Sequence, residues 1–247
     1  MKKTVFMVLV FMASAVLIAY AGPLDDVLKG VKLPSVPLQM GGSGSNLDDD
    51  TVVSGLKEAL SIGTGNAVSS ASKLDGYFKN QMIKILMPEK IQTVANVLGK
   101  LGYQKQVNDF ILSMNRAAEK AAPKARAYFV NAIKEMSFDD ARKILNGGDT
   151  AATDYFKSKT SEQLFNEFKP VVSKSMNETG VTRSYKEMTG KYMSAVPFAS
   201  MESLDLDQYV TNKSLDGLFY MVGQEEKKIR TDPTARVTDL LKKVFGK

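Results

Sequence analysis

The chain has 247 residues, with 33 Lys and Arg against 27 Asp and Glu, a formal net charge of +6, and neither His nor Cys. These counts exclude disulfides, thiolate nucleophiles and zinc sites built from Cys and His, and they remove the usual general base near neutral pH. The basic residues are scattered among acidic ones, whereas a nucleic-acid-binding face gathers them on one side. We therefore expect no nucleic-acid partner and no cofactor. A metal would need oxygen ligands, and we expect none because the acidic candidates are poor: in LDLDQYVTNKSLD, Val210 stands where a calcium loop needs a glycine.

The amino terminus, MKKTVFMVLVFMASAVLIAYAG, has the pattern of a secretory signal peptide. Two lysines precede an apolar stretch over residues 4–18, and Ala19-Tyr20-Ala21 provides small residues around a cleavage site. The apolar stretch is short for a bilayer span, which needs about 20 residues. We predict a signal peptide at residues 1–21, cleavage near Ala21, and a periplasmic or secreted protein of the bacterial envelope. A retained anchor is the alternative, and membrane contact is otherwise expected to be peripheral.

Composition divides the rest of the chain into a linker and one domain. Residues 22–47 contain three prolines and the run GGSGS, which is typical of a flexible linker. From Asp48 onward, apolar residues recur at helical spacing, and no stretch alternates as a strand would. The predicted fold class is all-α, a multi-helix bundle over residues 48–247, behind an amino-terminal signal peptide and flexible linker.

The first long helix is expected after the acidic cap at Asp48. Gly63 and Gly65 interrupt its pattern, and GTGNAV there resembles a fragment of a dinucleotide loop. No strand precedes these glycines, so close packing of two helices at small residues is the favoured interpretation. The stretch GYFKNQMIKILM at 76–87 is the most extended of the chain and indicates a connection or a short ribbon.

The next helices have clear boundary signals. Pro88 fits the first turn of a helix that Gly102 closes, and the apolar pattern then continues to Pro123. Another helix carries the apolar residues between 125 and 136. Ser137 and Asp140 have the spacing of a capping box, which predicts a short helix through residue 145.

The sequence ILNGGDTAATDYF predicts a joint between two helices. Gly147 falls where a helix ends on a left-handed residue, and Asp149 falls where the next helix needs an N-cap. A ligand loop is the alternative, because helix N-termini bind anions. The carboxylate of Asp149 would repel an anion, so we interpret Gly147 and Gly148 as a hinge.

Four further helical segments complete the domain. Thr160 or Ser161 is expected to cap a helix that Pro170 kinks and that ends at Gly180. Another helix covers VTRSYKEMTGKYMSAVP, and a long one begins at Asp205 and is broken by Pro233. A short amphipathic piece over residues 237–245 ends the chain.

Six residues are candidates for ligand binding. Asn115, Arg116 and Glu119 face one another on a helix, where Arg116 and Glu119 are most simply a surface ion pair. The sharper hypothesis has Arg116 holding a carboxylate or phosphate in an apolar-walled groove. Arg183 is either a solvent-facing arginine or the partner of Asp149 or Asp154 in an interior ion pair. The full set is Asn115, Arg116, Glu119, Asp149, Arg183 and Tyr192.

Tyr192 and the methionines have ordinary interpretations as well. Tyr185 and Tyr192 are seven residues apart on one helix face and are favoured as aromatics at the edge of the core. The many methionines are expected to fill the core, with the lining of a ligand cavity as the alternative.

Five ordered motifs resemble a family of exported bacterial proteins that is catalogued only as a domain of unknown function. They are LKEALSIGTGNAV, LSMNRAAEKAAPKA, ILNGGDTAATDYF, GVTRSYKEMTGKY and LDGLFYMVGQEEKKIRTDPTARVTDLLKKVFG. The resemblance covers roughly Asp48 to the carboxyl terminus. It implies a single helical domain behind a signal peptide, and it implies no reaction, cofactor or catalytic residue.

These observations favour an exported, non-enzymatic helical binding protein for a hydrophobic or lipid-like ligand or for a partner protein of the envelope. Two alternatives stay open. An enzyme that cleaves cell-wall glycan needs only two carboxyl groups, for which Glu119 with Asp149 or Asp154 are the candidates. An envelope assembly scaffold would contact its partner through the linker at residues 22–47.

Overall fold

The computed structural model describes residues 48–195, 204–232 and 238–245. The predicted signal peptide and linker lie outside these residues. Helices and short connections account for the whole described part of the chain, which contains no strand, so the all-α prediction is confirmed. None of the helices in the described ranges has the length and hydropathy needed to cross a membrane.

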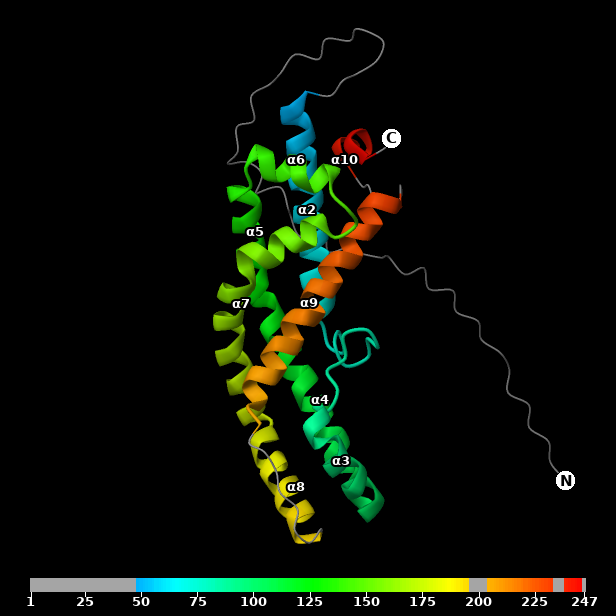
Figure 1. Ribbon diagram of the computed structural model, residues 1–247, viewed down its shortest axis with the longest axis vertical. Coiled ribbons are helices and arrows are strands. Elements are labelled where there is room, and N and C mark those ends of the chain that lie inside the picture. The colour runs from blue at the N-terminus through cyan, green and yellow to red at the C-terminus, as the bar shows by residue number, and fades with distance from the viewer. Residues whose placement is uncertain (1–47, 196–203, 233–237, 246–247) are drawn as a thin grey trace, which may run out of the picture. The chain divides into compact units, whose positions relative to one another are not determined.

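Three long helices form the centre of the fold. They are α2 (Asp49–Ser72), α7 (Ala151–Glu178) and α9 (Leu206–Thr231), and α9 packs against both of the others (Figure 1). Their buried faces enclose an aromatic core in which the rings of Phe129 and Phe156 meet edge to face at 5.2 Å between centroids. Phe129 comes from α5 (Ala125–Glu135), which packs on α2 and α7.

Helix α2 begins as predicted and then continues through both of its glycines. The carboxylate of Asp48 accepts a hydrogen bond from the Thr51 amide at 2.7 Å. A Cβ atom on Gly63 would lie 3.3 Å from Cδ1 of Ile229 on α9, whereas one on Gly65 would meet nothing within 4 Å. The prediction of close helix packing therefore holds at Gly63, where α9 approaches.

A hairpin of two helices follows the connection after α2. Pro88 is the N-cap of α3 (Glu89–Leu98), and a π-helical turn (Gly99–Tyr103) leads into α4 (Gln104–Ala121). Gly102 adopts φ 89° in this turn, where L side chains are strained. A 3₁₀ turn (Ala122–Lys124) joins α4 to α5. The capping box of Ser137 and Asp140 is confirmed at the start of α6 (Phe138–Asn146).

Helix α7 is longer than the sequence pattern predicted. Thr160 and Ser161 do not cap a new helix, because both lie inside α7, where the buried Thr160 hydroxyl donates to the Phe156 carbonyl at 2.7 Å. The helix also continues through Pro170. Gly180, at φ 71°, lies between α7 and α8 (Val181–Ala195). The last described helix is α10 (Asp239–Phe245). The predicted start of α9 at Asp205 is confirmed, because the Asp205 carboxylate accepts a hydrogen bond from the Gln208 amide at 2.8 Å.

The joint between α6 and α7 exists, but both of its predicted details are wrong. Gly147 has extended backbone angles of φ −82° and ψ 175°, and it is not left-handed. Glycine is needed here because a Cβ atom would lie 2.5 Å from the Ala151 Cβ and 2.8 Å from the Lys143 carbonyl oxygen. The N-cap position of α7 belongs to Thr150, whose side chain makes no capping bond, and Asp149 is exposed before it.

Helix α7 is capped instead by a residue of α9. The carboxylate of Glu226 accepts hydrogen bonds from the amides of Ala152 and Thr153, both at 2.9 Å, and from the Thr153 hydroxyl at 2.8 Å. Arg230 bonds to the same carboxylate at 2.9 Å and to the carbonyl of Ile144, in the last turn of α6, at 2.9 Å. The pair of Glu226 and Arg230 thus ties the end of α6 and the start of α7 to α9.

The two glycines of this joint should respond differently to alanine. Gly147→Ala should lower the free energy of unfolding by about 1–3 kcal/mol, the usual cost of forcing atoms into a packed site. Gly148→Ala is the matched control, because a Cβ atom there meets nothing within 4 Å, and its effect should stay within about 0.5 kcal/mol. Urea unfolding of both variants measures the difference. Equal losses in the two variants would contradict the steric role given to Gly147.

Candidate functional site

The connection between α2 and α3, residues 73–88, is fastened by polar contacts to its neighbours. Its first turn places Asp75 at φ 65°, a conformation that few residues other than glycine adopt. Arg116 on α4 reaches this carboxylate at 2.6 Å, and Lys79 reaches it at 2.8 Å. Hydrogen bonds from Lys79 and then from Arg116 hold the pKa of Asp75 below its usual value.

Glu119 is the buried centre of this polar cluster. One carboxylate oxygen accepts from the amides of Tyr77 and Phe78 at 3.1 and 3.2 Å, and the other pairs with Arg116 at 2.6 Å. Burial opposes the charge of Arg116, but the hydrogen bonds to Glu119 and Asp75 raise its pKa above the ordinary value. Arg116 and Glu119 therefore pair as predicted, but they hold a loop and are not a surface pair.

Asn115 replaces the neighbouring strand that an extended chain normally needs. Its side-chain oxygen accepts from the Ile85 amide at 2.8 Å, and its side-chain nitrogen donates to the Ile85 carbonyl at 2.8 Å. The same nitrogen also donates to the Ile111 carbonyl at 2.8 Å. Both main-chain groups of the buried Ile85 are thus satisfied by one side chain that is itself fully buried.

Tyr77 fastens the connection to α9. Its ring is fully buried, and its hydroxyl donates to the Ser214 carbonyl at 2.6 Å. Burial, followed by the nearby charges of Glu119 and Asp216, raises the pKa of Tyr77 far above its usual value, so the hydroxyl stays protonated. A Cβ atom on Gly217 would lie 2.7 Å from this ring, which shows how closely α9 approaches the connection.

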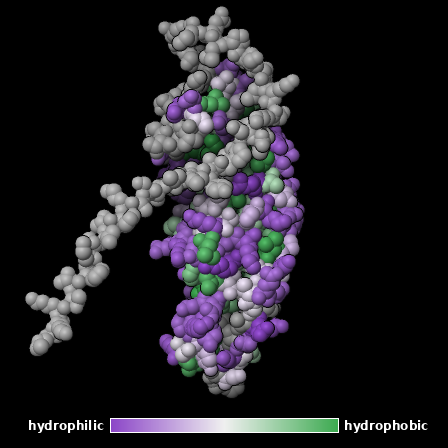
Figure 2. All heavy atoms as spheres, turned by 180° about the vertical axis from the view of Figure 1, so that it is seen from behind, coloured by the Kyte–Doolittle hydropathy of each residue, from purple (hydrophilic) through white to green (hydrophobic). Residues whose placement is uncertain are grey.

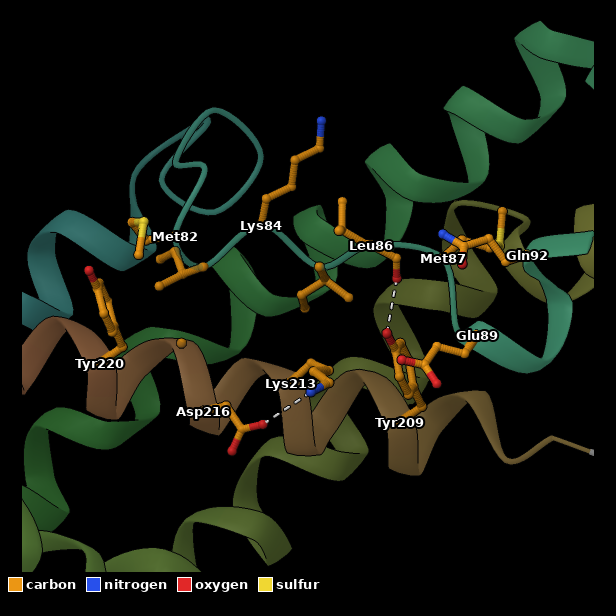
Figure 3. Close-up of a pocket in the computed structure, with 13 residues that line it drawn as sticks. Met82, Lys84, Leu86, Met87, Glu89, Gln92, Tyr209, Lys213, Asp216 and Tyr220 are labelled. Carbon is orange, nitrogen blue, oxygen red and sulfur yellow. Dashed lines mark hydrogen bonds and ion pairs between the residues drawn. The ribbon is translucent and has the colours of Figure 1, made fainter. Parts of the chain in front are cut away.

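A groove lies between the fastened connection and α9, and we call it the 82–89 groove (Figure 3). Its volume is about 500 Å³. Tyr209, Lys213, Asp216 and Tyr220 come from α9, and Glu89 and Gln92 come from the first turn of α3. The complete lining is Met82, Ile83, Lys84, Ile85, Leu86, Met87, Glu89, Gln92, Tyr209, Lys213, Asp216, Gly217 and Tyr220.

The lining mixes apolar surface with charges of both signs. Met82 is 66% exposed and Leu86 is 57% exposed, so the groove offers two large apolar side chains to solvent. On α9, the ammonium nitrogen of Lys213 and a carboxylate oxygen of Asp216 form an ion pair at 3.5 Å. The Tyr209 hydroxyl donates to the Leu86 carbonyl at 3.1 Å and connects the two walls (Figure 3).

A family model of proteins of unknown function, DUF4197, matches residues 46–246. The chain belongs to this family. The match confirms the resemblance to an uncharacterised family and includes both walls of the 82–89 groove. No curated protein and no solved structure matches the chain.

In this DUF4197 chain, three of the predicted candidates come together and three do not. Asn115, Arg116 and Glu119 lie in one layer behind the groove, where they position the connection and line none of the groove. Tyr192 is half-buried against the core. Asp149 and Arg183 are exposed at opposite ends of α7, a helix of 28 residues and therefore about 40 Å long, and they form no ion pair.

Glu119 has no free oxygen with which to serve a reaction. Both of its oxygens already accept hydrogen bonds, and its side chain is 5% exposed. Asp154 accepts a bond from the Thr150 hydroxyl at the start of α7. These contacts do not support the use of Glu119 with Asp149 or Asp154 as the acid and base of a glycan-cleaving site. Within the described ranges, acidic side chains form no group of three or more that could hold a metal ion.

The groove residues on α9 escaped the sequence analysis. Lys213, Asp216 and Tyr220 look like the solvent-facing side of an amphipathic helix, and nothing local distinguishes them from other such residues. The available signal was the stretch 76–87, which the sequence indicated to be the most extended of the chain. In the structure its residues 83–87 alternate between buried and more exposed positions, as an extended chain does. Met114, Met136 and Met176 are fully or almost fully buried core residues, whereas Met82 and Met87 line the groove.

Proposed function

We propose that this chain is an exported, non-enzymatic binding protein that holds an extended segment of a partner envelope protein in the 82–89 groove. The observation that supports the proposal most is the wall formed by residues 83–87, an irregular chain with alternating burial that side chains of α4 and α9 hold in place. An exposed extended segment of this kind can bind a peptide that lies beside it as a second extended chain and pairs with its main-chain groups.

The direction of the main-chain groups supports a peptide as the ligand. The amide and carbonyl of Ile85 are both bonded to Asn115, toward α4. Successive residues of an extended chain direct these groups to opposite sides. The main chain of Leu86 accordingly faces the other way, where its carbonyl already accepts from the Tyr209 hydroxyl. The Lys84 amide donates to the Asn80 carbonyl, so an added chain would pair with the Leu86 amide and the Lys84 carbonyl.

The mixed lining favours a peptide over an acyl chain. A lipid tail is best held by a closed and apolar cavity, whereas this groove exposes Met82 and Leu86 beside Lys213 and Asp216. A polypeptide offers alternating apolar and charged side chains that match both kinds of surface. The predicted lipid-like ligand therefore becomes the competing outcome of the test below.

Peptides selected from a display library of random linear sequences should bind the wild-type protein and lose affinity when Leu86 becomes Asp. We expect a loss of at least about tenfold, because an apolar contact of this size contributes about 1.5–3 kcal/mol. Isothermal titration calorimetry measures the affinities. Leu86 is more than half exposed, so the substitution should leave the thermal unfolding temperature almost unchanged.

Leu74→Asp is the matched control, since Leu74 is 74% exposed and does not line the groove. Selected peptides should bind this variant as they bind the wild type. If peptides bind the Leu86 and Leu74 variants equally well, the groove is not their site. If oleate binds the wild type with a thermal shift and no selected peptide does, the ligand is lipid-like and the peptide proposal is wrong.

A further inference from the structure

The far end of the α3–α4 hairpin forms a second exposed surface, separate from the 82–89 groove. There the turn Gly99–Tyr103 lies beside the last turns of α8, at the lower end of Figure 1. A hollow of about 570 Å³ between them is lined by Leu101, Tyr103, Glu187, Gly190, Lys191 and Ser194. Its residues come from the turn and from α8, so no residue of the groove contributes to it.

Two large aliphatic side chains project from this end. Leu101 and Met193 are each 53% exposed, whereas α3 and α4 bury apolar residues in the core and α8 packs Tyr185 and Tyr192 against it. Gly102, directly after Leu101, adopts a positive φ in the turn between α3 and α4. Burial of these side chains would be favourable, and nothing in the described part of the chain covers them.

Lysines lie close to the two exposed apolar side chains along the chain, since Lys100 precedes Leu101 and Lys191 comes two residues before Met193. Residues 91–111 and 184–195, which build this end, carry four lysines and two acids, a net charge of +2. Asp109 and Lys105 pair with each other at 2.6 Å, which leaves three lysines and Glu187, a residue that lines the hollow together with Lys191. The ammonium nitrogen of Lys191 lies 4.1 Å from the centre of the Tyr103 ring, so this charge is held next to the hollow. We call Lys100, Leu101, Lys191 and Met193 the basic tip.

We propose that the basic tip binds the surface of a bilayer that contains anionic lipids, with Leu101 and Met193 inserted among the lipids and the lysines at the phosphates. Lysine suits this position because its apolar stem can lie in the interface while its ammonium group stays hydrated. Each lysine near an anionic surface contributes about a fivefold gain in binding. The proposal is independent of the peptide function of the groove.

A bilayer fits this end better than a protein partner does. A stable protein interface buries about 800 Å² on each partner, with an apolar centre. The basic tip offers two exposed apolar side chains on different elements, each with a lysine one or two residues away in the chain. In the view from the opposite side, hydrophobic residues form small patches divided by hydrophilic ones, and no broad apolar area is visible on that face (Figure 2).

The test is co-sedimentation of the protein, in the form recovered from cells that express it, with vesicles of phosphatidylglycerol and phosphatidylcholine or of phosphatidylcholine alone. We expect binding to the anionic vesicles that weakens as salt is raised, and little binding to the neutral ones. Lys100→Gln with Lys191→Gln should weaken binding about 25-fold, since each lysine contributes about fivefold. Leu101→Ser should weaken it about tenfold or more.

Matched variants separate the tip from net charge and from general hydrophobicity. Lys124→Gln with Lys134→Gln removes the same charge from exposed positions at the start and end of α5, and Leu74→Ser removes an exposed leucine elsewhere. Both should bind anionic vesicles as the wild type does. Soluble glycerol phosphate at the same phosphate concentration should not compete, because it offers no interface for Leu101.

Three results would overturn the proposal. The first is equal binding to neutral and anionic vesicles, which would place the contact in another segment. The second is a loss of binding in the control variants as large as that in the tip variants. The third is concentration-dependent self-association, measured by sedimentation velocity, that the tip substitutions abolish while vesicle binding stays absent, because a second copy of the chain would then cover the tip.

Discussion

Replacement of Glu226 by alanine should lower the free energy of unfolding by about 3–5 kcal/mol, the usual cost of removing one partner of a buried ion pair. Glu226 is 5% exposed, and its carboxylate accepts bonds from two amides of α7, one hydroxyl and Arg230. The substitution would remove the carboxylate that Arg230, whose side chain is 16% exposed, pairs with on α9, and it would uncap α7.

The position of the damage is as informative as its size. Hydrogen exchange of the Ala152 and Thr153 amides should accelerate more than exchange in the middle of α7, because these amides lose their acceptor. Asp109→Ala is the control, since the ion pair of Lys105 and Asp109 is shorter, at 2.6 Å against 2.9 Å, but exposed. Its cost should stay within about 0.5 kcal/mol. Urea unfolding curves in which the two variants lose equal stability would refute the capping role of Glu226.

Asn115→Ala should produce the second large effect, a loss of about 2–4 kcal/mol. It would leave the buried amide and carbonyl of Ile85, and one bond of Ile111, without their partner. A buried polar group without a hydrogen bond costs about 1–3 kcal/mol. Because Asn115 holds the groove wall, the variant should also lose affinity for any peptide selected against the wild type.

An asparagine of the same helix supplies the control for this prediction. Asn108 on α4 is exposed and bonds only to the side chain of Gln104, at 2.9 Å. Asn108→Ala should change stability by less than about 0.5 kcal/mol and leave peptide affinity unchanged. Asn115→Asp is a stricter test, because aspartate can still accept from the Ile85 amide but cannot donate to the Ile85 carbonyl. A stable Asn115→Asp variant with an intact groove would show that the paired hydrogen bonds are dispensable.

Several elements of the fold could be predicted because their causes lie within one or two turns of the chain. Asp48, Ser137 and Asp205 cap the helices that they precede, and each side chain accepts from the amide three residues ahead. Asp140 completes the capping box by accepting from the Ser137 amide. Gly102 and Gly180 end helices where the chain needs a positive φ. The helical spacing of apolar residues was sufficient for the all-α class.

The joint at Gly147 shows where local signals fail. Its glycines and its aspartate imitate a left-handed ending followed by an N-cap, but the cap comes from Glu226, 73 and 74 residues away. Once an acid on α9 supplies the acceptors, Asp149 is not needed and stays in solvent. The predicted cap at Thr160 is wrong for a related reason, because the Thr160 hydroxyl donates to the Phe156 carbonyl inside α7.

At the candidate site, too, contacts within one helix could be predicted from the sequence and contacts between distant segments could not. The sequence alone determined that Arg116 and Glu119 would meet, because residues three apart on a helix face each other. Only the tertiary structure decided what they hold, since Asp75 and the amides of Tyr77 and Phe78 reach them from 41 and 42 residues away. Local order follows from backbone geometry and nearby side chains, whereas the groove exists because packing brings α9 against a connection that is distant in the chain.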